Sequence, residues 1–145
     1  MSNDFEYLSF FPYPQIREEQ TTAINFALDA FINNQKKFVI IEAGTGVGKS
    51  AVGYTIAKYL NNQNLKPDST FEDGSYFITT QKILQEQYIK DFGSGPRPMR
   101  SIKSSSNYRC TYNKKNSCGE SQRLLKVADK KSRFFKACTF NCSYK

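Results

Sequence analysis

The stretch AGTGVGKS, residues 43–50, decides the fold of this chain. It follows a short apolar run, KFVIIE at 37–42, and matches the phosphate-loop pattern except at Ala43, where the pattern has its first glycine. Its glycines permit a tight turn in which several backbone N–H groups point at one phosphate. Lys49 can then reach the β- and γ-phosphates, and the Ser50 hydroxyl can ligate Mg²⁺. The stretch therefore predicts a binding loop for a nucleoside triphosphate.

Every residue of this loop is a candidate for binding the nucleotide. The set is Ala43, Gly44, Thr45, Gly46, Val47, Gly48, Lys49 and Ser50, with Lys49 as the catalytic candidate and Ser50 as the Mg²⁺ ligand. The apolar run before the loop and the amphipathic segment after it supply the strand and helix that such a loop requires.

Hydrophobic periodicity predicts helices and strands on both sides of the loop. We expect helices at 16–34, 49–60, 82–92 and 120–135, and strands at 37–42, 75–79 and 99–103. We expect a loop at 61–74 and a helix-breaking segment at 93–98. The alternation of short apolar strands with helices predicts an α/β fold built on a parallel sheet. The segment after the third strand is mostly helical.

Charge divides the 145 residues into two regions. Residues 1–96 hold 8 basic and 11 acidic side chains, whereas residues 97–145 hold 13 basic and 2 acidic ones. A basic surface attracts polyanions, of which nucleic acid is the commonest. We therefore expect a near-neutral domain at 1–103 and a basic one at 104–145, in which aromatic rings are interleaved with the cations.

Several function classes are excluded by composition. The chain has no histidine, which rules out a Ser-His-Asp triad and any Cys/His zinc finger. No apolar run is long enough for a membrane span, and the first residues do not read as a signal peptide. We expect a cytoplasmic protein with no membrane partner.

All four cysteines, Cys110, Cys118, Cys138 and Cys142, lie in the basic region. Reduced thiols gathered in a short cytoplasmic segment favour a metal over disulfides. No Cys-x-x-Cys pair of the kind common in zinc knuckles occurs. Spacing alone leaves a [4Fe–4S] cluster, zinc and unligated thiols open.

Four motifs in order resemble those of superfamily 2 DNA helicases of the DinG and XPD type. IEAGTGVGKS at 41–50 resembles motif I, where alanine at position 43 is ordinary, and YPQIREEQ at 13–20 resembles the adenine-reading Q motif. FITTQKILQEQYIKDF at 77–92 resembles motif Ia, and SIKSSSNYRC at 101–110 resembles the entry into the iron–sulfur domain. The resemblance extends over nearly the whole chain.

The resemblance implies an incomplete RecA-like motor domain followed by an iron–sulfur insertion. Gln20 would contact adenine, and the four cysteines would hold a [4Fe–4S] cluster, with zinc as the alternative. The residues that would contact single-stranded or forked DNA are Thr79, Thr80, Gln87, Lys103, Tyr108 and Arg109. The cofactors would be ATP and Mg²⁺, in a monomer of bacterial or phage origin.

Hydrolysis in this superfamily needs an Asp-Glu-x-His motif, and the chain contains no Asp-Glu pair. We therefore expect a helicase fragment that binds ATP but turns it over negligibly. Two other readings remain open: a zinc-stabilised nucleic-acid-binding module with a vestigial nucleotide loop, and a phosphate-loop ATPase unrelated to helicases.

Overall fold

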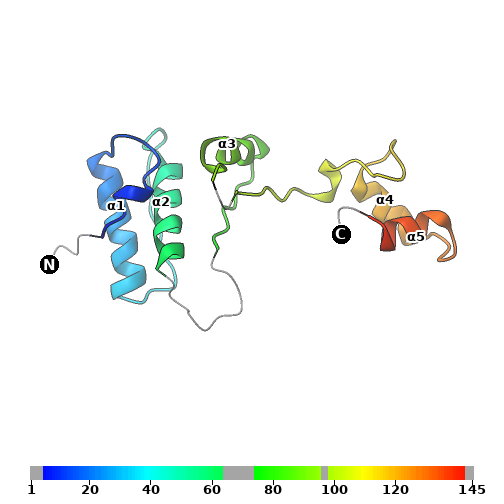
Figure 1. The fold of residues 1–145 in the computed structure, drawn as a ribbon, viewed down its shortest axis with the longest axis horizontal. Coiled ribbons are helices and arrows are strands. Elements are labelled where there is room, and N and C mark those ends of the chain that lie inside the picture. Colours follow the sequence, from blue (N-terminus) through cyan, green and yellow to red (C-terminus); the bar gives the residue numbers. More distant parts are fainter. Residues whose placement is uncertain (1–4, 64–73, 96–97, 143–145) are drawn as a thin grey trace. The chain divides into compact units, whose positions relative to one another are not determined.

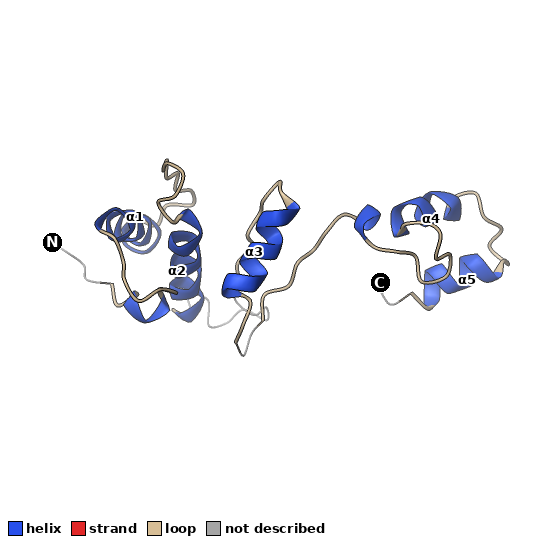
Figure 2. Cartoon of the chain, turned by 90° about the horizontal axis from the view of Figure 1, so that it is seen from above, coloured by secondary structure: helices blue, strands red, loops and turns tan. Residues whose placement is uncertain are grey.

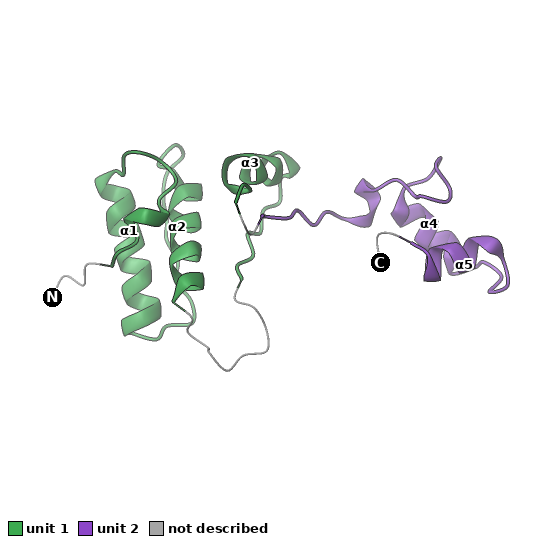
Figure 3. Cartoon of the chain, in the orientation of Figure 1, with its two compact units in different colours: residues 1–97 green, residues 98–145 purple. Residues whose placement is uncertain are grey.

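A computed structural model describes residues 5–63, 74–95 and 98–142 of the chain. The chain forms two compact units, Met1–Arg97 and Pro98–Lys145, coloured separately in Figure 3. The domain boundary expected after residue 103 stays a prediction. Within the described ranges, no helix has the length and apolar character that crossing a membrane requires.

The described residues form α-helices, the short 3-10 helices η1 and η3, and the π-helix η2, joined by loops (Figure 1). In the first unit they are η1 (Leu8–Phe10), α1 (Glu18–Leu28), η2 (Asp29–Asn33), α2 (Lys49–Asn62) and α3 (Lys82–Phe92). In the second unit they are η3 (Ser105–Asn107), α4 (Cys118–Leu125) and α5 (Arg133–Phe140). The helices expected at 49–60 and 82–92 are confirmed.

Helices α1 and α2 pack side by side and hold the core of the first unit (Figure 1). Ile24 and Leu28 of α1 are completely buried, and they meet Val52 of α2 and Tyr7 from the N-terminal segment. This packing fixes the start of α2, which immediately follows residues 43–48, relative to α1.

The helix expected at 16–34 is confirmed as α1 and its continuation. Glu18 and Glu19 occupy the first turn of α1, where the positive end of the helix dipole favours acidic side chains. The helix then widens to the π-helical η2, in which the backbone N–H of Asn34 donates to the carbonyl of Asp29 over 3.0 Å. The Asp29 carboxylate accepts hydrogen bonds from the side-chain amides of Asn33 and Asn34, both at 2.7 Å.

Aromatic rings hold α3 within the first unit. Phe92, at the end of α3, is buried and stacks on Tyr54 of α2 with ring centroids 4.7 Å apart. Tyr88 contacts Phe77, whose ring also lies beside Gly53 on α2. The segment before α3 and α3 itself therefore pack against α2.

No strand forms among the described residues, as Figure 2 shows, so the parallel sheet is not confirmed. The segments expected to be strands, 37–42, 75–79 and 99–103, are non-helical and have no ladder partner in the described ranges. Several of their apolar side chains are exposed, including Phe38 at 87%, Ile40 at 90% and Ile78 at 95%. A buried strand is defined by its neighbours on both sides, and these segments lack them here.

The single helix expected at 120–135 is wrong. The chain instead forms α4, a turn and α5, because two polar side chains interrupt the helix. Asp129 accepts the backbone N–H of Lys131 at 2.9 Å, and the Ser132 hydroxyl accepts that of Phe135 at 3.1 Å. Such local side-chain bonds favour turns and helix N-termini over helix interiors.

The expected break at 93–98 begins where α3 ends, and its residues 96–97 lie outside the described ranges, as do residues 64–73 of the expected loop.

Candidate phosphate-binding site

The loop at 43–50 turns sharply just before α2. Gly46 and Gly48 adopt left-handed backbone angles, with φ of 82° and 81°, which residues with a side chain rarely adopt. Gly48 caps α2, and its carbonyl accepts the N–H groups of Ala51 and Val52 at 3.0 and 3.2 Å. The first turn of α2 contains no acidic residue, so its positive dipole end faces the loop without a carboxylate of its own.

Lys49 folds back across the loop. Its Nζ donates to the carbonyl of Gly44 at 2.6 Å and to that of Ala43 at 3.1 Å, while the side chain stays exposed. Ser50, the second residue of α2, is half-buried. The ammonium group and the hydroxyl therefore lie at the junction of the loop and the helix, where the sequence predicted them.

Gln20, in the first turn of α1, and Arg17, which immediately precedes α1, both donate hydrogen bonds to backbone carbonyls of the loop. Gln20 is 7% exposed, and its Nε2 donates to the carbonyl of Val47 at 3.0 Å, while its Oε1 accepts the backbone N–H of Arg17 at 3.0 Å. Arg17 Nη1 donates to the carbonyl of Gly46 at 3.3 Å. The sequence proposed Gln20 as an adenine contact, which stays a prediction, and missed Arg17. The signal for Arg17 was its place three residues before Gln20.

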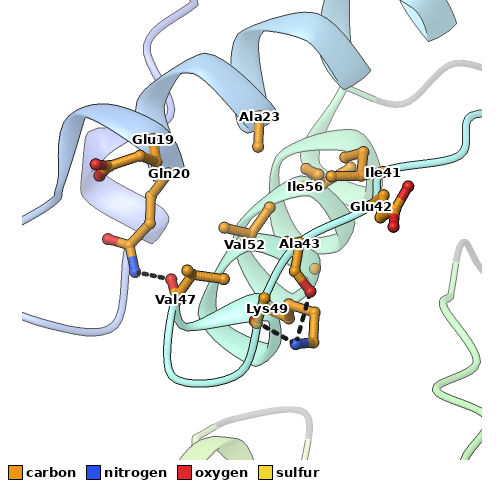
Figure 4. A pocket seen from close by; sticks show the side chains of 12 residues that line it. Glu19, Gln20, Ala23, Ile41, Glu42, Ala43, Val47, Lys49, Val52 and Ile56 are labelled. Atoms are coloured by element: carbon orange, nitrogen blue, oxygen red, sulfur yellow. Dashed lines mark hydrogen bonds between the residues drawn. The ribbon is translucent and has the colours of Figure 1, made fainter.

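A hollow of about 430 Å³ opens beside the loop (Figure 4). Figure 4 shows the Gln20 side chain reaching Val47 while apolar side chains of α1 and α2 face the space. It is lined by Glu19, Gln20, Ala23, Ile41, Glu42, Ala43, Gly44, Val47, Lys49, Val52, Gly53 and Ile56. An apolar hollow bordered by a lysine and a few polar groups is the usual form of a small-molecule site.

The predicted DNA contacts fall into two groups, one in each unit. Thr79 and Thr80 precede α3, and Gln87 is exposed on that helix. In the second unit, Lys103 donates its backbone N–H to the Tyr108 hydroxyl at 3.1 Å, which brings these two residues together beside Arg109. Their role in binding DNA stays a prediction.

The four cysteines do not assemble into a metal site among the described residues. Cys110 and Cys138 are buried, Cys118 and Cys142 are half-buried, and none of the four is in a disulfide. Within the described ranges, no three Cys, His, Asp or Glu side chains lie close enough to hold a metal ion. This arrangement does not fit a four-thiolate iron–sulfur or zinc site.

Cys110 instead organises a turn of the second unit. Its sulfur accepts the backbone N–H of Asn113 at 3.2 Å. Burial raises the pKa of the Cys110 thiol, but the neighbouring Ser121 hydroxyl and the backbone N–H groups of Asn113 and Tyr112 bring the pKa below its ordinary value.

The family comparison matches residues 13–139 to the res subunit of type III restriction enzymes. The chain belongs to this family. Res-subunit domains are superfamily 2 helicase-like P-loop domains, which makes the chain part of an ATP-dependent nucleic-acid enzyme family. The matched range contains Gln20 and the whole phosphate loop, but it does not single out the iron–sulfur helicases. Neither the curated proteins nor the solved structures gave a match.

Proposed function

We propose that this chain, a member of the res-subunit family, binds ATP and Mg²⁺ through residues 43–50. It would serve as the nucleotide-binding part of a DNA helicase of the DinG and XPD type. The observation that carries the proposal is Lys49. Its ammonium group is held at the loop by the backbone carbonyls of Ala43 and Gly44. It lies at the start of α2, whose first turn contains no acidic side chain. An incoming phosphate would replace these weak neutral acceptors with a charged one.

Each group near the loop has a part in holding the triphosphate. The N–H groups of Lys49 and Ser50 precede the helical hydrogen bonds of α2 and would donate to phosphate oxygens. Lys49 would balance the β- and γ-phosphate charge, and Ser50 would supply one oxygen to Mg²⁺, which takes its other ligands from water and the phosphates. The hollow beside the loop offers an apolar place for the nucleoside, with Gln20 at its border.

Binding is proposed for this chain, and hydrolysis for the complete motor. Transfer of the γ-phosphoryl group to water needs a residue that orients the water, and the loop itself supplies none. The sequence contains no Asp-Glu pair that could take this role. We therefore expect ATP to bind and turnover to be negligible.

The DNA part of the proposal rests on two segments, in which Thr80, Gln87 and Arg109 are exposed and Thr79, Lys103 and Tyr108 are half-buried. Thr79, Thr80 and Gln87 would contact the backbone of a single strand in the first unit, and Lys103, Tyr108 and Arg109 would do so in the second. In helicases with two motor domains, closure of the domains on ATP moves the strand. We propose a cytoplasmic monomer that acts on single-stranded or forked DNA.

No step of this function passes through the cysteines, because their described arrangement does not fit the [4Fe–4S] cluster that the resemblance implies, nor zinc. A cluster would require the four thiols to gather from the positions described. The visible absorption spectrum and the iron and zinc content of anaerobically purified protein distinguish a cluster, zinc and free thiols.

A titration with a fluorescent ATP analogue tests the proposal. Lys49→Ala removes a charge-assisted contact worth about 1.5–3 kcal/mol, so the Kd should rise by about 10- to 100-fold. The matched control is Lys37→Ala, which removes an exposed lysine of the same unit outside the loop. Equal affinity of the wild type and Lys49→Ala would overturn the proposal.

A further inference from the structure

The second unit contains a hollow of about 600 Å³ that is separate from the phosphate loop. Two short segments line it: Ser106, Asn107, Tyr108 and Arg109 on one side, and Lys114, Lys115, Asn116 and Ser117 on the other. We name this hollow the basic-turn site. Its volume lies within the usual range for ligand pockets, and it is larger than one phosphate ion fills.

Backbone hydrogen bonds fix the two segments against each other. Arg109 and Ser117 form an antiparallel bridge, flanked by bonds from Cys118 N to Tyr108 O at 2.7 Å and from Cys110 N to Asn116 O at 3.0 Å. The shape of the hollow is therefore set by the main chain rather than by its exposed side chains.

A tight turn places the two lysines at the site. Asn116 N donates to Asn113 O at 3.0 Å, so Lys114 and Lys115 are the two central residues of the turn. The sulfur of Cys110 accepts the N–H of Asn113 at 3.2 Å and holds the start of the turn. Both lysines are exposed, as is Arg109 on the opposite segment. Three cations thus border one hollow.

The site is electropositive although one acidic residue, Glu120, lies near it. No acidic side chain lines the hollow. The Glu120 carboxylate is hydrogen-bonded at the start of α4. Its Oε2 accepts the backbone N–H of Ser117 at 2.7 Å and the Ser117 hydroxyl at 2.9 Å. The charge pattern therefore favours a ligand with more than one negative group.

The uncharged lining indicates which polyanion fits. Ser106, Asn107 and Asn116 also line the hollow, and hydroxyl and amide groups such as theirs commonly contact the phosphates and sugars of nucleic acids. Tyr112, within the same turn region, is half exposed and lies 5.7 Å from the ring of Phe134. An aromatic face beside a row of cations is the usual means of holding a single strand.

We propose that the basic-turn site binds the phosphodiester backbone of single-stranded nucleic acid through Arg109, Lys114 and Lys115. The proposal rests on the proposed function for its substrate class. It adds a strand-binding site that is built by the 113–116 turn.

The test compares two lysine pairs in the full chain. Binding of a fluorescein-labelled oligothymidine is followed by anisotropy over a range of salt concentrations. Lys114→Ala with Lys115→Ala should weaken binding about 10-fold or more at low salt and reduce the salt slope by roughly 1.4, the value for two single-strand phosphate contacts. The control pair, Lys130→Ala with Lys131→Ala, removes the same charge from exposed positions outside the hollow, and its effect should be much smaller.

Other outcomes overturn the proposal. Equal losses from both pairs would mean diffuse attraction by the whole basic unit. Competition by millimolar inorganic phosphate as strong as competition by unlabelled oligonucleotide would identify a free-phosphate site. Preference for vesicles containing anionic lipid would identify a membrane surface.

Unchanged ATP-analogue binding by the Lys114/Lys115 variant shows that the first unit stays folded. Loss of strand binding in that variant with ATP binding intact separates this proposal from the one on Lys49.

Discussion

The side-chain amide of Gln20 donates a hydrogen bond to the backbone carbonyl of Val47, 27 residues further along the chain, at 3.0 Å. The contact joins the first turn of α1 to the middle of the phosphate loop. Since the other end of the same amide accepts the N–H of Arg17, Gln20 braces the loop from a buried position. Its proposed contact with adenine would be made by a group that already has two protein partners.

Replacing Gln20 separates these two roles. Gln20→Ala should leave the Val47 carbonyl without its partner and lower the free energy of unfolding by about 1–3 kcal/mol. If Gln20 acts mainly by bracing the loop, the affinities for ATP and GTP should fall by the same factor, as measured with fluorescent analogues of both. Gln15→Ala, at an exposed position just before α1, is the control. A loss confined to ATP would instead assign Gln20 to the base.

Gly48 is the position of the loop least able to accept a side chain. Its φ of 81° is strained for any other residue, and a Cβ there would collide with Gln20 Nε2. Gly48→Ala should therefore cost about 1–2 kcal/mol from the left-handed backbone alone and also displace Gln20. Chemical denaturation and ATP-analogue binding should both report the loss.

Gly44→Ala is the matched control, because a Cβ at Gly44 meets no atom within 4 Å. Its free energy of unfolding should stay close to that of the wild type. If the two substitutions cost the same, the described loop conformation is wrong.

The start of α4 should respond to acid. Hydrogen bonds from the backbone N–H and the hydroxyl of Ser117 hold the pKa of Glu120 below its ordinary value. A carboxyl group whose pKa is lowered by folding stabilises the folded state above its unfolded pKa, and this contribution is lost as the pH falls through the folded pKa. The melting temperature of wild type should thus fall more steeply with acidification than that of Glu120→Gln, which keeps the capping geometry without the titration. Parallel curves for the two proteins would refute the assignment.

Local sequence signals located most of the helices, but the sheet that they predicted is not confirmed, and the contacts that brace the loop were not predicted. The 3.6-residue spacing of apolar side chains and the glycines at 44, 46 and 48 are local, and they located α2 correctly. Strands depend on partners distant in sequence, and within the described ranges residues 37–42 and 75–79 have none. The Gln20–Val47 bond joins two segments that no periodicity relates. The break between α4 and α5 was missed because the side chains of Asp129 and Ser132 compete with the helix for backbone N–H groups.

The cysteines provide a last test of the second unit. In the arrangement described, Cys118 and Cys142 are half-buried, whereas Cys110 and Cys138 are 8% and 9% exposed. A thiol reagent followed by mass spectrometry should therefore modify Cys118 and Cys142 first. Hydrogen bonds lower the pKa of Cys110, but burial denies the reagent access, so Cys110 should react only as the unit opens. If all four thiols are protected together and become reactive together when a chelator removes a metal, they share a metal centre and the described separation of the thiols is wrong.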